Sequence, residues 1–269
     1  MKKNWTGERL ETFINGRDAI EHLHRYAILS NCIINKVVLD IACGEGYGSN
    51  LLAQNASYVH GVDIDEQTII LANKKYKKKN LNYTVGDTSK IPFDNNFFDV
   101  VVSYETIEHH DQHHEMIKEI KRVLKPNGKI IISTPDKLFY SDKTNFSNKF
   151  HIKELYKQEF LNLMSSYFSK TQLLTQQYSN GVSIIQDETE ISNLTFFTGN
   201  FIEIHKKAID PLYLIIIASD IDFSKTKISI FDGVKILEEQ LQKTIYSTKS
   251  YKIGNMILLP IRWIRKKIK

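Results

Sequence analysis

Short apolar runs alternate with amphipathic segments through the middle of the chain. Each run has the length of a strand and is apolar on both faces, as in a sheet covered on both sides. The five runs lie at residues 37–41, 58–62, 82–85, 98–103 and 129–133. Between them, apolar residues recur at helical spacing over residues 49–54, 66–78 and 113–124. This alternation predicts an α/β fold, a doubly wound parallel sheet with helices on both faces.

The two ends of the chain follow other patterns. Helical spacing of apolar residues between Ile20 and Ile28 predicts a helix ahead of the sheet. Beyond Thr134 we predict a helix near residues 153–164 and strands near 171–178 and 212–219. The expected parts are an N-terminal helical cap (1–35), a main domain (36–220) with an insertion (179–210), and a C-terminal extension (221–269).

Charge is unevenly distributed along the chain. Its 36 Lys and Arg against 31 Asp and Glu give a formal charge of +5. No acidic residue follows Glu239, and eight basic ones do, so residues 1–239 carry 28 − 31, or −3. A nucleic-acid-binding protein more often has a basic body. We therefore expect no nucleic-acid partner.

Cysteine content and apolar length bear on the compartment. Two cysteines, Cys32 and Cys43, are too few for a disulfide scaffold and suit a reducing cytoplasm. The N-terminus lacks the apolar stretch of a signal peptide. The longest uninterrupted apolar run, residues 212–218, is far shorter than the roughly 20 residues that span a bilayer. We expect a cytoplasmic protein, at most peripheral to the inner face of the membrane.

The first strand leads directly into a glycine-rich loop, residues 40–48, with the sequence Asp-Ile-Ala-Cys-Gly-Glu-Gly-Tyr-Gly. Glycines let the backbone approach a ligand that side chains would exclude. Asp63 ends the second strand, 19 residues after Gly44, where a carboxylate can accept hydrogen bonds from ribose hydroxyls. The order predicts an adenosine-binding site. The alternative is a plain tight turn, with Asp63 only capping the next helix.

The loop closely resembles the glycine motif of class I S-adenosylmethionine-dependent methyltransferases. Matching segments follow in order at residues 61–65, 85–88, 98–101 and 122–128, so that residues 36–136 look like one methyltransferase core. The resemblance implies a Rossmann-like, mostly parallel seven-stranded sheet. It also implies S-adenosyl-L-methionine as cofactor, with S-adenosyl-L-homocysteine as product.

The resemblance assigns roles to individual residues. In this family the acid matching Asp63 holds the ribose, the one matching Asp87 holds the adenine amino group, and Asp40 supports the glycine loop. Arg25, on the N-terminal helix, could pair with the methionine carboxylate; the alternative is a surface arginine. The other residues expected at the cofactor are Ala42, Cys43, Gly44, Gly46, Ile64, Thr88 and Tyr104.

Four flanking segments, residues 8–9, 21–26, 105–109 and 150–155, look like a bacterial subgroup associated with methylation of sugars in surface polysaccharides. This likeness implies an O-methyltransferase acting on a sugar hydroxyl of lipopolysaccharide O-antigen, capsule or a precursor. The alternatives are a small-molecule methyltransferase of the quinone or lipid kind and a non-catalytic S-adenosylmethionine-binding module. A nucleic-acid methyltransferase is disfavoured, because residues 103–106 read Ser-Tyr-Glu-Thr rather than Asn/Asp-Pro-Pro-Tyr.

Candidate catalytic residues follow the fourth and fifth strands, since ligands of such sheets lie beyond the carboxyl ends of the strands. A histidine can accept a hydroxyl proton near neutral pH. We place His109 first and His151 second as the base, with Glu105 as orienting group or alternative base. The alternatives are that His109 caps the next helix or hydrogen-bonds a backbone carbonyl, and that His151 anchors its loop.

Histidines and acids crowd residues 109–115, and some of the histidines have i, i+4 spacing. A solvated helix start explains this crowding without a metal, which is the interpretation we prefer. Some methyltransferases with a Glu-x-x-Glu-His segment use a divalent ion there. A weaker alternative is therefore a metal site of Glu105, Glu108 and His109.

The C-terminal segment, residues 255–269, is amphipathic and basic. Ile257, Ile261, Ile264 and Ile268 recur at helical steps, while arginines and lysines fill another face. Such a helix suits an anionic membrane surface. We expect residues 255–269 to contact a membrane or a partner such as a glycosyltransferase; the alternatives are a helix packed on the domain and a frayed end.

Overall fold

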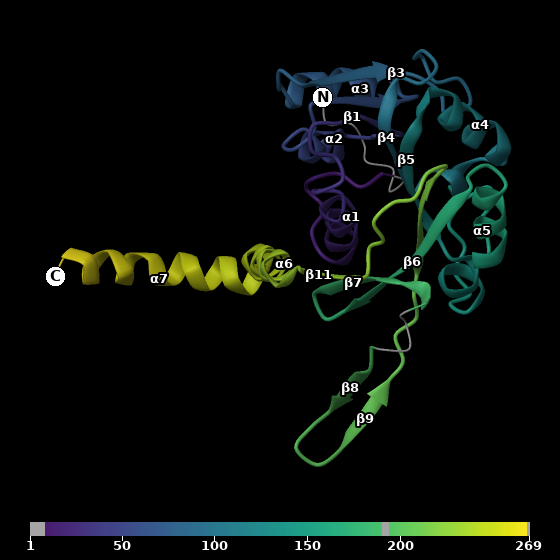
Figure 1. The fold of residues 1–269 in the computed structure, drawn as a ribbon. Helices are drawn as coiled ribbons and strands as arrows, with labels where there is room; N and C mark the ends of the chain where they lie inside the picture. Colours follow the sequence, from purple (N-terminus) through teal and green to yellow (C-terminus); the bar gives the residue numbers. More distant parts are fainter. Residues whose placement is uncertain (1–8, 190–193, 268–269) are drawn as a thin grey trace.

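The computed structural model describes residues 9–189 and 194–267, with only the backbone from residue 259 onward. Nine strands form one sheet in the order β11-β7-β6-β10-β5-β4-β1-β2-β3 (Figure 1). β10 and β7 run antiparallel to their neighbours, so the other strands share one direction. The strands are β1 (Val37–Ile41), β2 (Tyr58–Asp63), β3 (Leu81–Val85), β4 (Phe98–Tyr104), β5 (Leu124–Pro135), β6 (Lys170–Ser179), β7 (Val182–Asp187), β10 (Tyr213–Ser219) and β11 (Ile228–Asp232).

Helices cover both faces of the sheet, as the unbroken apolar strands require. Along β4, Phe98 and Val101 belong to one buried cluster, whereas Val100 and Val102 belong to the other. The first cluster lies under α4 (His113–Val123) and α5 (Lys157–Ser165); the second lies under α1 (Arg17–Ala27), α2 (Tyr47–Leu52) and α3 (Glu66–Lys75). The predicted doubly wound α/β fold is confirmed.

The sheet has two more strands than the seven predicted. The seven expected strands are all present, as β1 to β6 and β10, and the additions are β7 and β11 at the antiparallel edge. β7 begins the segment predicted as an insertion, and β11 lies in the predicted C-terminal extension, yet the two pair with each other. A boundary after residue 220 therefore divides strands of a single sheet.

Two elements project from this edge (Figure 1). One is the hairpin of β8 (Phe196–Gly199) and β9 (Ile204–Lys207), a separate two-stranded sheet within the predicted insertion. The other is α7 (Lys249–Lys267), which follows α6 (Val234–Ser247). Among the described residues, no helix combines the length and apolarity that a membrane crossing needs. Most of the predicted basic amphipathic face, from residue 259 on, lies outside the described side chains.

Candidate active site

A cavity of about 570 Å³ opens where the parallel strands end. The glycine loop, the ends of β2 to β5, the loop after β5 and the N-terminal segment all contribute to its wall. The predicted residues in its lining are Ala42, Cys43, Gly44, Asp63, Ile64, Asp87, Thr88, Tyr104, Glu105, His109 and His151. Arg25, Asp40 and Gly46 are the predicted site residues outside the described lining. One cavity thus holds both the expected cofactor residues and the expected catalytic residues.

The glycine loop is curled by three backbone positions in the left-handed region. Ala42, Gly44 and Gly46 have φ of 59°, 53° and 87°. For Ala42 this conformation costs about 1–2 kcal/mol, and such strain concentrates at ligand sites. A Cβ on Gly46 would lie 2.6 Å from the ring of Tyr83. The loop therefore requires glycine at this position for close packing as well as for backbone conformation.

Asp63 joins the end of β2 to the loop. Its Oδ2 accepts a hydrogen bond from the Gly44 amide at 2.9 Å, and its Oδ1 accepts from the Asp65 amide at 3.0 Å. Arg9 also donates to Oδ1 at 3.1 Å. The helix-capping alternative is wrong, because Asp65 is the N-cap of α3 and accepts from the Thr68 amide at 2.9 Å. Arg9 was not predicted for this site, since only folding brings it next to Asp63.

The other two aspartates differ in environment. Asp40 is buried beneath the loop, where its carboxylate accepts from Ser49 Oγ at 2.6 Å and from Tyr26 Oη at 3.4 Å. Burial raises the pKa of Asp40 to about 7. Asp87 accepts from the amide and the hydroxyl of Ser89, and these hydrogen bonds lower the pKa of its carboxyl. Asp87 is therefore the charged member of the pair at neutral pH.

Arg25 is fully buried, so the surface-arginine alternative is wrong. Its Nη1 donates to Gln176 Oε1 at 2.6 Å, its guanidinium lies 4.7 Å from the Tyr213 ring, and Nη1 is 4.0 Å from Glu105 Oε1. Nε and Nη2 have no hydrogen-bond partner among the described residues. Because Tyr213 and Glu105 line the cavity, Arg25 sits directly behind its wall.

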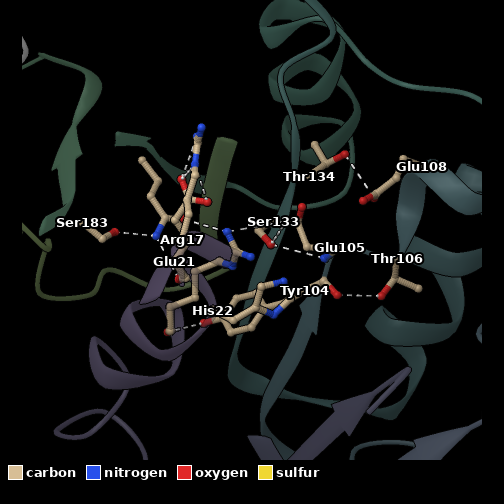
Figure 2. A network of polar contacts seen from close by, with 12 residues as sticks. Arg17, Glu21, His22, Tyr104, Glu105, Thr106, Glu108, Ser133, Thr134 and Ser183 are labelled. Atoms are coloured by element: carbon tan, nitrogen blue, oxygen red, sulfur yellow. Dashed lines mark hydrogen bonds and ion pairs between the residues drawn. The ribbon is translucent and has the colours of Figure 1, made fainter. Parts of the chain in front are cut away.

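Glu105 is held in place by its neighbours. It has a left-handed φ of 51°, and its Oε1 accepts from Ser133 Oγ of β5 at 2.6 Å. Figure 2 shows Glu105 and Ser133 between Glu21 of α1 and the Thr134–Glu108 pair. A carboxylate engaged in this way suits the orienting role better than that of the base.

The two candidate histidines meet in the cavity. His109, in the 3-10 turn η1 (Ile107–His109), and His151 have ring centroids 5.2 Å apart and nearly perpendicular planes. His109 Nδ1 donates to the Phe150 carbonyl at 3.1 Å, because a carbonyl can only accept. Its lone pair is then at Nε2. They meet because β4 and β5, which precede them, are adjacent in the sheet.

His151 has a carboxylate partner that we did not predict from the sequence. Its Nδ1 lies 2.5 Å from Glu154 Oε1, and both side chains are 8% exposed. Glu154 Oε2 accepts from Ser141 Oγ at 2.5 Å. His151 Nε2 accepts a hydrogen bond from Asn148 Nδ2 at 3.0 Å, and the ring stacks on Tyr140. The His-x-x-Glu spacing was the available signal.

The structure changes the membership of the potential metal site. The ligand atoms of Glu108, His109 and His151 lie within 4.8 Å of one another, while Glu105 is turned toward Ser133. One carboxylate and two imidazoles suit a divalent transition metal. Burial, and secondarily the charge of Glu105, raises the pKa of Glu108. Because a protonated carboxyl is a poor ligand, a cation bound here would have to favour the ionised form of Glu108, as the Thr134 hydroxyl and the charge of Arg25 already do in part.

Two other histidines of the crowded segment, His113 and His114, have local partners. His113 Nε2 lies 2.8 Å from the His110 carbonyl, and His114 Nδ1 lies 2.9 Å from Tyr167 Oη. His110 lines the cavity without joining the group of Glu108, His109 and His151. His113 is buried, and both ring nitrogens of His110 are buried without a hydrogen-bond partner among the described residues. The interpretation as a solvated helix start stays a prediction.

Comparison with known proteins finds similarity to methyltransferases. Residues 39–132 match the family model described as a methyltransferase domain. A protein of Mycolicibacterium smegmatis named as a probable S-adenosylmethionine-dependent methyltransferase is 32% identical over 142 residues, 52% of this chain and 54% of the relative. A ubiquinone biosynthesis O-methyltransferase of Coxiella burnetii is 35% identical over 106 residues, 39% of this chain and 45% of the relative. The chain thus spans about half the length of these curated relatives.

Solved structures agree on the fold. A methyltransferase from Archaeoglobus fulgidus superimposes with a TM-score of 0.56 at 19% identity, covering 76% of this chain and 94% of that chain. A protein from Pyrococcus horikoshii gives 0.52 at 22% identity, with coverage of 80% and 93%. The fold is that of the class I methyltransferases. More particularly, residues 39–132 resemble the methyltransferase domain of the family model, and the Mycolicibacterium relative is named as a probable S-adenosylmethionine-dependent methyltransferase.

Proposed function

We propose that this protein transfers the methyl group of S-adenosylmethionine to a sugar hydroxyl of a surface polysaccharide, lipopolysaccharide O-antigen or capsule, or of its precursor. The observation that supports an oxygen acceptor is the pair of imidazoles, His109 and His151, in the same cavity as the cofactor residues. A neutral hydroxyl is a weak nucleophile, and it must lose its proton as its oxygen forms the new bond. A base at the acceptor is therefore the feature that hydroxyl methylation needs.

We assign the base to His151. Glu154 accepts the Nδ1 proton of His151, so the lone pair of the ring is at Nε2, where the acceptor hydroxyl would replace the hydrogen bond that Asn148 Nδ2 donates at 3.0 Å. When bound, S-adenosylmethionine supplies an electrophilic methyl group on a positively charged sulfur. As the acceptor oxygen forms its bond to that carbon and the carbon–sulfur bond breaks, the hydroxyl proton passes to His151 Nε2. Glu154 then stabilises the resulting imidazolium.

His109 remains the alternative base, since its Nδ1 contact also leaves the lone pair at Nε2. A second route to the same product would use a divalent ion held by Glu108, His109 and His151. Such an ion would lower the pKa of a coordinated hydroxyl in place of a base. The two routes differ in their sensitivity to chelators.

The lining around the two histidines supports a sugar rather than a quinone. Tyr140 and Asn148 contact His151, and Asp111 and Gln112 contribute further hydrogen-bonding groups to the cavity. Polar side chains with one or two aromatic rings suit a polyhydroxylated ligand, whereas a quinone ring with its lipid tail needs an apolar channel. The likeness to the Coxiella ubiquinone enzyme extends over 106 residues, 39% of this chain, and it favours the quinone alternative only weakly.

The test is product analysis with matched acceptors. The full chain is incubated with S-adenosylmethionine and either polysaccharide fragments and nucleotide sugars or a catechol-type quinone precursor, and products are identified by mass spectrometry. We expect methyl transfer to a sugar hydroxyl. Methylation of the quinone precursor alone would establish the rival activity. Binding of S-adenosylhomocysteine with no turnover on either series would favour the non-catalytic module.

A further inference from the structure

The tip of the β8–β9 hairpin carries unusually exposed apolar side chains. Phe201 is 112% exposed relative to the standard reference and Ile202 is 94% exposed, while Ile204 and Phe197 are 73% and 61% exposed. The hairpin extends well beyond the nearest helices (Figure 1). Isolated exposed apolar residues are ordinary, but four on one two-stranded projection are a mark of an interaction site.

Strand pairing places two of these side chains on one face. Phe197 pairs with Lys206, and Gly199 pairs with Ile204, so Phe197 and Ile204 share a face of the hairpin. Lys206, directly opposite Phe197, shares this face, and Phe201 and Ile202 lie in the turn between the two strands. The hairpin therefore ends in an exposed apolar tip with apolar and cationic side chains behind it.

Cations lie behind the tip. Lys206 and Lys207 end β9, four and five residues from Ile202, which puts them about 13–17 Å back along the strand. Glu203 is the acid nearest the tip, and its carboxylate lies 3.4 Å from His205 Nε2. An apolar tip with lysines at this depth matches the order of acyl chains and anionic headgroups at a membrane surface.

The helix α7 also projects from this edge of the sheet, and it too combines exposed apolar side chains with lysines. On α7, Ile253, Met256 and Ile257 are 53%, 67% and 62% exposed, and their spacing places them on one stripe. α7 also carries Lys249 and Lys252, and no acidic residue follows Glu239 in the sequence. The hairpin follows β7 and α6 follows β11, and these two strands pair with each other.

We propose that the hairpin tip and α7 together attach the protein to an anionic lipid surface. The proposal goes beyond the proposed function and does not depend on it. A fluid interface accepts a convex, fully exposed tip without a matching groove, and the lysines supply attraction to acidic headgroups. Two weak attachments on one body bind more strongly than either alone, because the second contact forms within a molecule already held at the surface.

Co-sedimentation of the full chain with vesicles tests this proposal. Vesicles of mixed phosphatidylcholine and phosphatidylglycerol are compared with vesicles of phosphatidylcholine alone. The tip variant combines Phe201→Ser with Ile202→Ser, and the helix variant combines Met256→Ser with Ile257→Ser. The matched control is Ile70→Ser, which removes a 51% exposed apolar side chain from α3, a helix that contacts the opposite edge of the sheet. Because these side chains are exposed, none of the changes should prevent folding.

We expect the wild type to bind the mixed vesicles and to bind pure phosphatidylcholine much less. The tip variant should lose about tenfold or more in partition, since each tip side chain withdraws from the acyl region, and the helix variant should also weaken binding. The control should bind within about twofold of the wild type. Wild-type protein that ignores anionic vesicles, or a tip variant that binds like the control, overturns the proposal. Light scattering showing a dimer that only the tip variant abolishes, without vesicle binding, would assign the hairpin to contacts between copies and also overturn it.

Discussion

His151, which lines the cavity, and Glu154 form a hydrogen-bonded pair with 2.5 Å between His151 Nδ1 and Glu154 Oε1. Neither side chain has much contact with solvent, as each is 8% exposed. A carboxylate on Nδ1 fixes the ring orientation and favours the imidazolium that forms when Nε2 takes a proton. This relationship gives the proposed mechanism its first test.

Glu154→Gln should lower kcat by about 10- to 100-fold with little change in the affinity for S-adenosylhomocysteine, because the amide no longer fixes the tautomer or stabilises the imidazolium. Steady-state kinetics across pH would measure kcat and KM, and calorimetry would measure the cofactor affinity. Glu115→Gln, on the exposed side of α4, is the control. Unchanged kcat and pH profile in Glu154→Gln would remove Glu154 from the mechanism.

Asp63→Ala should weaken S-adenosylhomocysteine binding by about 10- to 100-fold. In the variant the ribose would lose its hydrogen bonds to a carboxylate, and the Gly44 amide would lose its hydrogen-bond partner. Isothermal calorimetry measures this, with circular dichroism to verify folding. The exposed Asp94→Asn variant should bind as the wild type does. Undiminished binding by Asp63→Ala would contradict the assigned role.

Gly46→Ala should destabilise the glycine loop by about 2–4 kcal/mol, from left-handed strain together with the close contact to Tyr83. We expect a lower Tm and weaker cofactor binding in thermal unfolding with and without S-adenosylhomocysteine. Gly254→Ala is the matched control, since a Cβ there meets nothing within 4 Å. Equal Tm values for the two variants would show that the loop tolerates a side chain.

Asp40 should make stability depend on pH. Its pKa of about 7 lies above that of the unfolded chain, near 3.8, so the folded state holds its proton more tightly. The contribution of Asp40 to the free energy of unfolding is therefore fully present at low pH. It falls by at most about 4 kcal/mol as the pH rises from about 4 to 7. Asp40→Asn removes the titration. The Tm of Asp40→Asn should rise relative to the Tm of the wild type as the pH increases from about 4 to 7. If the difference between the two Tm values stays constant over this range, the assignment is refuted.

Chelation separates the base from the metal route. With His151 as the base, EDTA followed by gel filtration should leave activity within about twofold, and added Mn²⁺ should not raise it. Loss of activity that Mn²⁺ restores would instead assign Glu108, His109 and His151 to a metal site. His151→Ala should be inactive under either route, so that variant checks the assay and does not choose between the routes.

The sequence predicted the central strands because helices on both sides demand unbroken apolar residues. β7 gave no such signal: Ser183 and Gln186 are buried there as polar residues, and Ser183 bonds to Gln176 and to His24 of α1. For Arg25 the sequence left two interpretations open, a surface arginine and a cofactor-binding residue. It could not decide between them because the partners of Arg25, Gln176 and Tyr213, are distant in sequence. Burial of polar groups by remote partners is what a local pattern cannot show.

The two sides of the cavity come from separate stretches of chain. The residues that meet the cofactor in our proposal lie mainly between Asp40 and Thr88, whereas Tyr140, Asn148, His151 and Glu154 all belong to the one connection from β5 to α5. Changing that connection would leave the glycine loop and its aspartates untouched. Relatives could thus exchange acceptors by altering a single loop, and grafting this loop into a related methyltransferase would carry the base together with its carboxylate.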